Sequence, residues 1–387
     1  MAEAKWTVMV LMGANNIADH EQDLSTFADD DLEEMKAVGS KAGVLNIVVQ
    51  IDQKIEKGGP QRLFIEKGRA VPDDLIPQGE GSSGDQRVLA DFLKWAKTKY
   101  PAEQYMLVLW GHAYRLAFNR NPKDPDGLDF PILAAVLDET NVGKKLDIVA
   151  FDSCNASLVE AAYQLRKTAR FLVASQFTDP LPGWPYERIL RRALDDPMHE
   201  YVGPLGPEDF GRAITSQFVR HYAGSKSVTM TMLDLSRVDE IGDRVQELAC
   251  ALGSALAANQ AELARIKAML GRSQVPDERR GQPAVDLATF CWHLSRDSGD
   301  SALRTAAFEL GEDLLVLGDP DGKREKKPFI VAHAKSGLLV ASLNGVSVFA
   351  PSIASGFDSI DLRQKYQALD MSQDTLWDEF VYALVAG

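Results

Sequence analysis

Short apolar runs alternate with longer amphipathic segments through the first half of the chain. Runs of β-branched and aliphatic residues predict buried strands, whereas apolar residues spaced three and four apart predict helices that pack on them. Strands and helices that take turns predict a mainly parallel central sheet with helices on both faces. We expect strands at 6–12, 44–52, 171–175 and just before residues 112 and 154, an edge hairpin at 61–66, and helices at 30–38, 85–99, 131–141 and 156–167.

The second half has a less regular pattern. Helical spacing covers 207–223, 238–270, 286–317 with a break near 297–300, and 374–384, while apolar β-type runs occupy 228–233, 329–334 and 345–350. We therefore expect an α/β domain at 1–224 and a C-terminal α+β region at 225–387 that completes or buttresses the sheet. The stretches at 77–85 and 119–127 are rich in turn-forming residues and are expected to be exposed loops.

Two of the apolar runs end in reactive side chains, one at His112 and the other at Cys154. Open α/β folds place their sites at the carboxyl ends of such strands. A thiol attacks as thiolate and needs a neighbour that takes its proton, for which histidine is suited. The pair is therefore a candidate catalytic dyad, with the backbone amides of Ala113 and Cys154 as candidate donors to an oxyanion. The same pattern also fits a small buried cysteine and a structural histidine at a strand end.

Composition narrows the class of protein. Apolar residues make up 45% and charged residues 25% of the 387 positions, which is ordinary usage for a globular protein. A formal net charge of -14 argues against a nucleic-acid binder, because phosphate contacts need clustered Lys and Arg. The cysteines are Cys154, Cys250 and Cys291. They show neither paired spacing nor nearby histidines at metal-ligand spacing, so we expect no disulfide framework and no metal site.

The apolar runs also bear on location. No apolar stretch approaches the roughly 18 residues that a membrane span needs. The N-terminal sequence lacks the basic start and apolar core of a signal peptide. We therefore expect a cytoplasmic protein with no membrane partner.

Several short motifs follow one another along the chain. They are WTVMVLMGANN at 6–16, DLEEM at 31–35, NIVVQID at 46–52, LVLWGHA at 107–113, DIVAFDSCNASLVEAAY at 147–163, LVASQ at 172–176, PGWPY at 182–186 and GVSVFAP at 345–351. This ordered set resembles the clostripain family of cysteine peptidases, which belongs to the caspase-like clan. The resemblance implies a caspase-like α/β/α sandwich for residues 1–224 and a cysteine endopeptidase that hydrolyses peptide bonds after Arg or Lys.

The resemblance implies roles for single residues. His112 would assist the thiol or protonate the leaving amine, and Cys154 would form the acyl-enzyme. Asp152 would be the carboxylate at the base of the S1 pocket, where the forked guanidinium of Arg offsets the cost of burying a charge. We take Asp179 as a second candidate for the pocket wall. The alternative for Asp179 is a solvated loop residue that starts a turn before Pro180.

One position departs from the family pattern. Glycine usually follows the catalytic histidine, whereas this chain has Ala113, followed by Tyr114 and Arg115. Alanine keeps the N–H donor, so the oxyanion site survives if the backbone there does not need a positive φ. The departure keeps open a degenerate member that binds basic peptides without cleaving them. A separate alternative is a cysteine hydrolase of small amides or esters.

Members of this family typically cut themselves in the loop between the histidine and cysteine strands. Here that loop, at 118–127, contains Arg120 and Lys123 in a turn-rich setting, so we expect self-cleavage at one of them. The pair at 144–145 is a less accessible basic candidate. A peptidase that acts on proteins or peptides with exposed Arg or Lys must be restrained. We therefore expect control by self-cleavage, by an inhibitory segment or by a regulatory protein partner.

The chemistry requires no cofactor, but some members of the clan use calcium. Two acidic segments contain the hard oxygen ligands that calcium prefers. Neither has the spacing of an EF-hand loop, and a solvated loop explains both equally well. The first segment contains Asp124, Asp126, Gly127 and Asp129, and the second spans 19–34.

Overall fold

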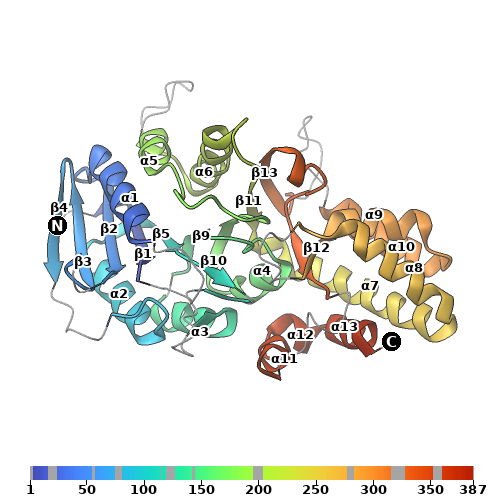
Figure 1. Ribbon diagram of the computed structural model, residues 1–387. Coiled ribbons are helices and arrows are strands. Elements are labelled where there is room, and N and C mark those ends of the chain that lie inside the picture. Colours follow the sequence, from blue (N-terminus) through green and yellow to red (C-terminus); the bar gives the residue numbers. More distant parts are fainter. Residues whose placement is uncertain are drawn as a thin grey trace.

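The computed structural model describes residues 3–15, 24–54, 57–74, 81–114, 116–118, 127–141, 144–194, 204–276, 283–314, 327–351 and 360–386, and the statements below concern these residues. A mixed sheet of nine strands runs through them in the order β13-β11-β10-β9-β5-β1-β2-β3-β4 (Figure 1). The five central strands, from β10 to β2, are parallel, whereas antiparallel pairs occupy both edges. The expected mainly parallel sheet is therefore confirmed. The strands are β1 (Ala4–Gly13), β2 (Leu45–Asp52), β3 (Gln61–Glu66), β4 (Arg69–Asp74), β5 (Ala102–Trp110), β9 (Leu146–Asp152), β10 (Ala169–Ala174), β11 (Val228–Asp234) and β13 (Ile330–Ser336).

Helices cover both faces of this sheet (Figure 1). Side chains alternate along each strand, so Val8 and Val10 of β1 join the core under one layer, and Met9 and Leu11 join the core under the other. Both faces are buried, which explains why the central strands read as continuous apolar runs. The α/β/α sandwich is thereby confirmed. One layer contains α1 (Ser25–Val38), α5 (Tyr186–Leu194) and α6 (Pro207–Tyr222), and the other contains α2 (Gln86–Lys99), α3 (Phe130–Thr140) and α4 (Val159–Leu165).

The chain after α6 contributes to the same sheet. It supplies β11 and β13, and then extends beyond that edge as a group of packed helices (Figure 1). The amide of Gln176, which follows β10, donates to Asp286 Oδ2 at 3.0 Å and to Ser347 Oγ at 2.9 Å. The sheet therefore contains strands from both sides of residue 224. The expected division into two regions at 224/225 stays a prediction. The further elements are α7 (Val238–Ala258), α8 (Gln260–Ser273), β12 (Ala284–Asp286), α9 (Leu287–Asp297), α10 (Ser301–Leu314), β14 (Ser347–Phe349), α11 (Ile360–Gln367), α12 (Asp370–Asp374) and α13 (Trp377–Ala386).

Three sequence expectations about helices were wrong in detail. The helix expected at 156–167 begins only at Val159, because Ser157 pairs instead with Ser347, whose N–H donates to the Ser157 carbonyl at 2.9 Å. The long helix at 238–270 is divided at Asn259, whose side chain caps α8 by accepting from the Ala261 N–H at 2.9 Å. Helix α5 was not expected, although its apolar positions lie on one face.

Candidate active site

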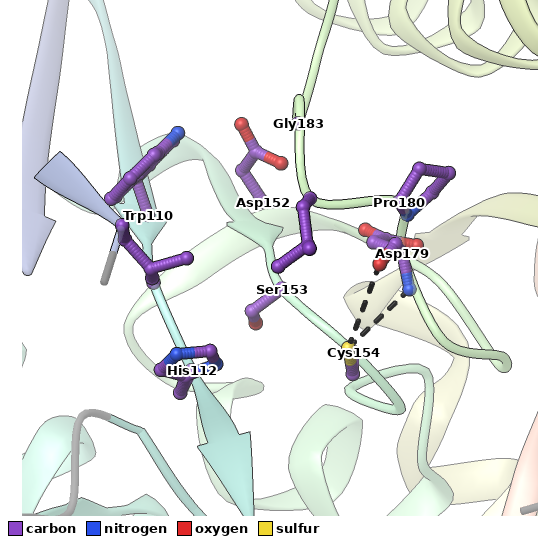
Figure 2. Close-up of a pocket in the computed structure, with 11 residues that line it drawn as sticks. Trp110, His112, Asp152, Ser153, Cys154, Asp179, Pro180 and Gly183 are labelled. Carbon is purple, nitrogen blue, oxygen red and sulfur yellow. Dashed lines mark hydrogen bonds between the residues drawn. The ribbon is translucent and has the colours of Figure 1, made fainter. Parts of the chain in front are cut away.

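His112 and Cys154 emerge side by side at the carboxyl edge of the sheet. Strands β5 and β9 are parallel neighbours, and their register pairs Trp110 with Asp152. Each candidate residue lies two positions beyond that pair, so the two residues follow adjacent strands at the same edge of the sheet. Both side chains line one cleft, shown in Figure 2, together with the loop that follows β10. The cleft is lined by Leu24, Trp110, Gly111, His112, Asp152, Ser153, Cys154, Asp179, Pro180, Leu181 and Gly183.

The backbone on either side of the pair is sharply bent. Gly111, just before His112, has a φ of 148°, a conformation that side-chain-bearing residues rarely adopt. Asn155, just after Cys154, has a φ of 54° in the left-handed region, which asparagine tolerates better than most residues. Both strands therefore turn abruptly at the cleft, so that the histidine and the thiol face it rather than the core.

The Cys154 sulfur is held by the loop after β10. The Asp179 backbone N–H donates to Cys154 Sγ at 3.4 Å, and the Asp179 carbonyl oxygen lies 4.0 Å from the same sulfur (Figure 2). Cys154 is partly exposed. The loop therefore fixes the sulfur where a substrate can reach it, and cysteine attacks as the thiolate.

Asp152 is a buried carboxylate with neutral partners. It is 5% exposed, and its Oδ2 accepts from the backbone N–H of Trp184 at 3.2 Å and from the Tyr186 hydroxyl at 2.9 Å. Burial raises the pKa of Asp152 to about 7, and Glu34 adds to this effect, while the two hydrogen bonds oppose it. Sequence reasoning named Asp152 but missed Tyr186, although the motif at 182–186 contains it.

Asp179 presents a second buried carboxylate to the cleft. Figure 2 shows its side chain beside Cys154. Neither oxygen has a hydrogen-bond partner among the described residues. The nearby Ser175 hydroxyl has a weak lowering effect on the pKa of Asp179. That hydroxyl is already hydrogen-bonded to the Phe177 carbonyl oxygen and to the Thr229 hydroxyl. Burial, and then the charge of Asp152, raise the pKa of Asp179 well above its ordinary value. The alternative of a solvated loop aspartate is therefore wrong.

A third acid lies behind the cleft wall. Asp31 of α1 is 2% exposed, and its Oδ2 accepts from the Trp110 indole N–H at 2.6 Å. The sequence offered only one signal for it, the position of Asp31 at the start of the motif at 31–35. Within the described ranges, no lysine or arginine is among the groups that act on Asp31, Asp152 or Asp179.

With this geometry in place, comparisons with known proteins become informative. The family model described as the clostripain family matches residues 14–383. The chain belongs to the clostripain family. Its sequence is 25% identical over 200 residues to clostripain of Hathewaya histolytica, and the match covers 42% of this chain and 38% of that protein's length. The family resemblance expected from the ordered motifs is therefore confirmed, and the chain is a member of a family of cysteine peptidases.

Two solved structures share the fold of this clostripain-family chain. One is an inactive zymogen C11 protease from Parabacteroides distasonis, with a TM-score of 0.68, 18% identity, and coverage of 97% of this chain and 99% of that one. The other is a secreted C11 cysteine protease from Bacteroides thetaiotaomicron in complex with an irreversible peptide inhibitor. It has a TM-score of 0.63, 19% identity, and coverage of 97% of this chain and 100% of that one.

The departure from the family pattern at Ala113 is compatible with the local backbone. Ala113 begins the short strand β6 (Ala113–Tyr114), which belongs to a small sheet with β7 (Ala117–Phe118) and β8 (Leu128–Asp129). The non-glycine residues with positive φ in the described chain are Leu116 and Asn155, so Ala113 is not one of them. Loss of the family glycine therefore imposes no strain at this position.

The other predicted site residues fall in three groups. Arg115, Arg120, Lys123, Asp124 and Asp126 lie outside the described residues, as do residues 19–23 of the acidic segment at 19–34. Two described acids of the calcium candidates have protein partners: Asp129 caps α3 by accepting from the Ile132 N–H at 3.1 Å, and Asp29 pairs with Lys57 at 2.6 Å. In the basic pair at 144–145, each lysine donates to a backbone carbonyl oxygen, that of Glu103 or Arg166.

The described residues contain neither a metal-binding group of acidic, histidine or cysteine side chains nor a membrane-spanning helix. No group of three or more His, Cys, Asp or Glu in these residues could hold a metal ion. No described helix is both long and apolar enough to cross a membrane. Of the remaining cysteines, Cys250 is exposed on α7 and Cys291 is buried in α9, and neither forms a disulfide.

Proposed function

We propose that this clostripain-family protein is a cysteine endopeptidase that cleaves after Arg or Lys, with Cys154 as nucleophile and His112 as its partner. The observation that carries the proposal is the acidic set in the cleft. Asp152 and Asp179 line the cleft beside the thiol, both at least nine-tenths buried, and no described cation neutralises them. A buried carboxylate without a cation is costly, and a guanidinium or ammonium from the substrate would offset that cost.

The proposed reaction follows from the position of each group. His112 would take the proton of the Cys154 thiol, the resulting thiolate would attack the carbonyl carbon of the basic residue, and the developing oxyanion would accept from the backbone N–H groups of Ala113 and Cys154. His112 would give a proton to the leaving amine as the C–N bond breaks. Water would then hydrolyse the acyl-enzyme and restore the thiol. Asp152 and Asp179 would hold the P1 cation, which orients the scissile bond toward the sulfur.

The size of the cleft supports control of this activity. The space inside it measures about 30 Å³, which accommodates one or two water molecules rather than an arginine side chain. Residues 119–126 connect β7 to β8 in the small sheet beside the site, since Phe118 pairs with Leu128. We propose that self-cleavage at Arg120 or Lys123 in this connection lets the cleft open. A regulatory protein partner and a requirement for calcium stay open in the same proposal, and cytoplasmic location stays a prediction.

Fluorogenic peptides with Arg, Lys or Ala at P1 test the proposal directly. The protein should cleave the Arg and Lys peptides at least about 100-fold faster than the Ala peptide. Cys154→Ala should lower that activity by more than about 1,000-fold, because the covalent step is lost. Cys250→Ala is the matched control, since it removes an exposed thiol on α7 far along the chain and should leave the rate unchanged. The same screen with and without calcium tests the ion.

Two outcomes would contradict this function. Absence of turnover in the unmodified protein, despite binding of basic peptides, would indicate a degenerate member of the family. Equal rates with Asp152→Ala and with the unmodified protein on small esters would indicate a hydrolase of small substrates. Intact masses of the same proteins test self-cleavage. Cleavage predicts two fragments for the unmodified protein and one full-length mass for Cys154→Ala, and identical full-length masses would rule it out.

A further inference from the structure

One acid in the cleft region has no role in the reaction just described. This inference rests on the proposed function and concerns Asp31, which lies near the middle of α1. Its Oδ2 accepts the Trp110 indole N–H at 2.6 Å, and Trp110 itself lines the cleft. Asp31 therefore lies directly behind the cleft wall, although it is 121 positions before Asp152 in the sequence. A buried carboxylate that fixes a cleft-lining side chain is positioned to influence what enters the cleft.

Gly183 shows how close Asp31 is to Asp152. A Cβ atom on Gly183 would lie 3.2 Å from Asp31 Oδ2 and 3.2 Å from Asp152 Oδ2. The two carboxylates thus flank a space that exists because residue 183 has no side chain. Gly183 lines the cleft, and its φ of 68° lies in the left-handed region that favours glycine. The gap between the two acids is therefore part of the cleft wall.

Independent observations point to an organic cation as the occupant. Asp179 has two buried carboxylate oxygens without a hydrogen-bond partner among the described residues, and Figure 2 shows this side chain at the cleft beside Cys154. The described acids do not form a metal-binding group. A buried acid that lacks both a donor and a metal is best matched by a ligand with several N–H donors and a positive charge.

The charged groups that act most strongly on Asp31 are the acids Asp152, Glu34 and Asp30. Burial first, and then the charge of Asp152, raise the pKa of Asp31 well above its ordinary value, and the Trp110 hydrogen bond only partly opposes this. Burial beside a second carboxylate therefore favours the protonated form of Asp31 while no cation is present. The titratable neighbours are Asp30 and Glu34 on α1, Asp152 on β9, Tyr186 on α5 and Tyr222 on α6.

We propose that Asp31 is a further specificity-determining residue of the S1 pocket, which exchanges a proton for the P1 cation. When a guanidinium enters, Asp31 releases its proton to solvent and becomes a carboxylate. One positive charge arrives and one leaves, so the net charge of the buried cluster is unchanged. A guanidinium offers N–H donors in a fork that serves two carboxylates at once, whereas an ammonium is a point charge. The preference for Arg over Lys should therefore grow as the pH rises.

Binding to the full-length Cys154→Ala protein, which cannot cleave, tests this exchange. The ligands are a tripeptide amide ending in Arg and the same peptide ending in citrulline, a neutral isostere. Calorimetry at pH 8 in two buffers with different ionisation enthalpies counts the protons released on binding. We expect at least one proton released with the Arg peptide and none with the citrulline peptide, because a bound cation favours the ionised form of the buried acids around it and Asp152 is already mostly ionised at this pH.

Asp31→Asn in the same background removes the group that exchanges the proton. Release should fall by about one proton, and the affinity for the Arg peptide should fall about tenfold at pH 8.5 but less than about twofold at pH 6. Absence of proton release in the parent protein overturns the proposal without any variant. Undiminished release in Asp31→Asn assigns the proton to another acid, and equal weakening at both pH values indicates a structural role; each overturns it. Equal affinity for the Arg and citrulline peptides would instead refute the basic specificity itself.

Discussion

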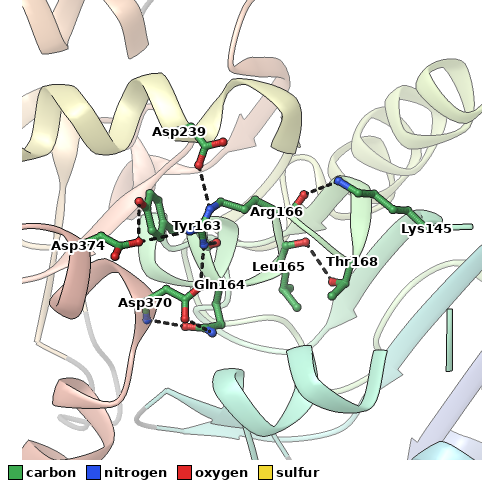
Figure 3. A network of polar contacts seen from close by, with 9 residues as sticks. All are labelled: Lys145, Tyr163, Gln164, Leu165, Arg166, Thr168, Asp239, Asp370 and Asp374. Carbon is green, nitrogen blue, oxygen red and sulfur yellow. Dashed lines mark hydrogen bonds and ion pairs between the residues drawn. The ribbon is translucent and has the colours of Figure 1, made fainter. Parts of the chain in front are cut away.

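Asp239, Asp370 and Asp374 surround Arg166 at the end of α4. Asp152 and Asp179 line the cleft that contains Cys154, and Asp31 lies behind the wall of that cleft. In the first group the chain provides the cation. Arg166 contacts Asp239 at 2.8 Å, Asp370 at 2.8 Å and Asp374 at 3.3 Å (Figure 3). Its guanidinium also lies 3.8 Å from the centre of the Tyr163 ring. This Arg166 cluster ties α4 to α7 and α12, so its charges serve the packing of the C-terminal region.

The cleft acids lack such a cation within the described chain, and their surroundings differ accordingly. Asp239, Asp370 and Asp374 are each at least one-third exposed to water, whereas Asp31, Asp152 and Asp179 are buried. Water stabilises the first set in addition to the arginine. In the cleft, only protons and neutral donors such as Tyr186 compensate the charge. The difference indicates that one cluster is complete and the other is preorganised for a positively charged ligand.

Removal of one acid should therefore lower mainly the activity in the cleft and mainly the stability in the Arg166 cluster. Asp152→Asn should lower kcat/KM for an Arg peptide by about 100-fold or more, because it removes the buried charge that faces the P1 cation. Asp374→Asn should leave kcat/KM within about twofold and should instead lower the stability by up to about 1 kcal/mol. Peptidase assays and chemical denaturation of both variants make the comparison. Equal losses of activity would show that the two clusters do not differ in function.

Glu160 of α4 provides an intermediate case, a buried acid without an arginine that lies away from the cleft. Its Oε1 accepts from the Phe349 N–H at 2.8 Å and the Tyr366 hydroxyl at 3.2 Å, and burial raises the pKa of Glu160 to about 7. This pKa exceeds the value in the unfolded chain. The contribution of Glu160 to the unfolding free energy is therefore fully present below about pH 4.5 and is lost as the pH rises through 7.

Glu160→Gln should remove this dependence. The unfolding free energy of the unmodified protein, relative to the variant, should fall by up to about 3 kcal/mol between pH 4.5 and pH 8. Chemical denaturation across that range measures the difference. A constant difference at all pH values would mean that Glu160 does not change its protonation between the folded and unfolded states.

Arg166→Ala should lower the stability by about 1–2 kcal/mol, less than the change expected at Glu160, since its partners are already partly solvated and the loss includes packing on Tyr163. Activity per folded molecule should stay within about twofold, because Arg166 does not line the cleft. Arg166→Lys is the matched control. It keeps the charge but cannot contact three carboxylates in one plane, so it should restore only part of the lost stability. A large loss of peptidase activity in Arg166→Ala would show that the cluster also shapes the site.

Much of the site could be predicted from the sequence because strand order is a local pattern with a strong rule behind it. The apolar runs before His112 and Cys154 predicted adjacent parallel strands, and the register of β5 and β9 fulfils this. Asp152 and Asp179 were named correctly as residues of the cleft. Asp31 and Tyr186 were missed, because nothing local marks an acid on α1 or a hydroxyl on α5 as a neighbour of Asp152.

The sequence by itself therefore determined the parallel sheet, its covering helices and the edge at which the thiol and imidazole emerge, since these depend on periodicities a few residues long. Only the tertiary structure decided which acids share an environment. Asp31 meets Asp152 across the space left by Gly183, and Arg166 meets Asp370 from a segment 204 residues away. Electrostatic interactions depend on distance in space and on burial, and both are set by the packing of elements that are remote in sequence.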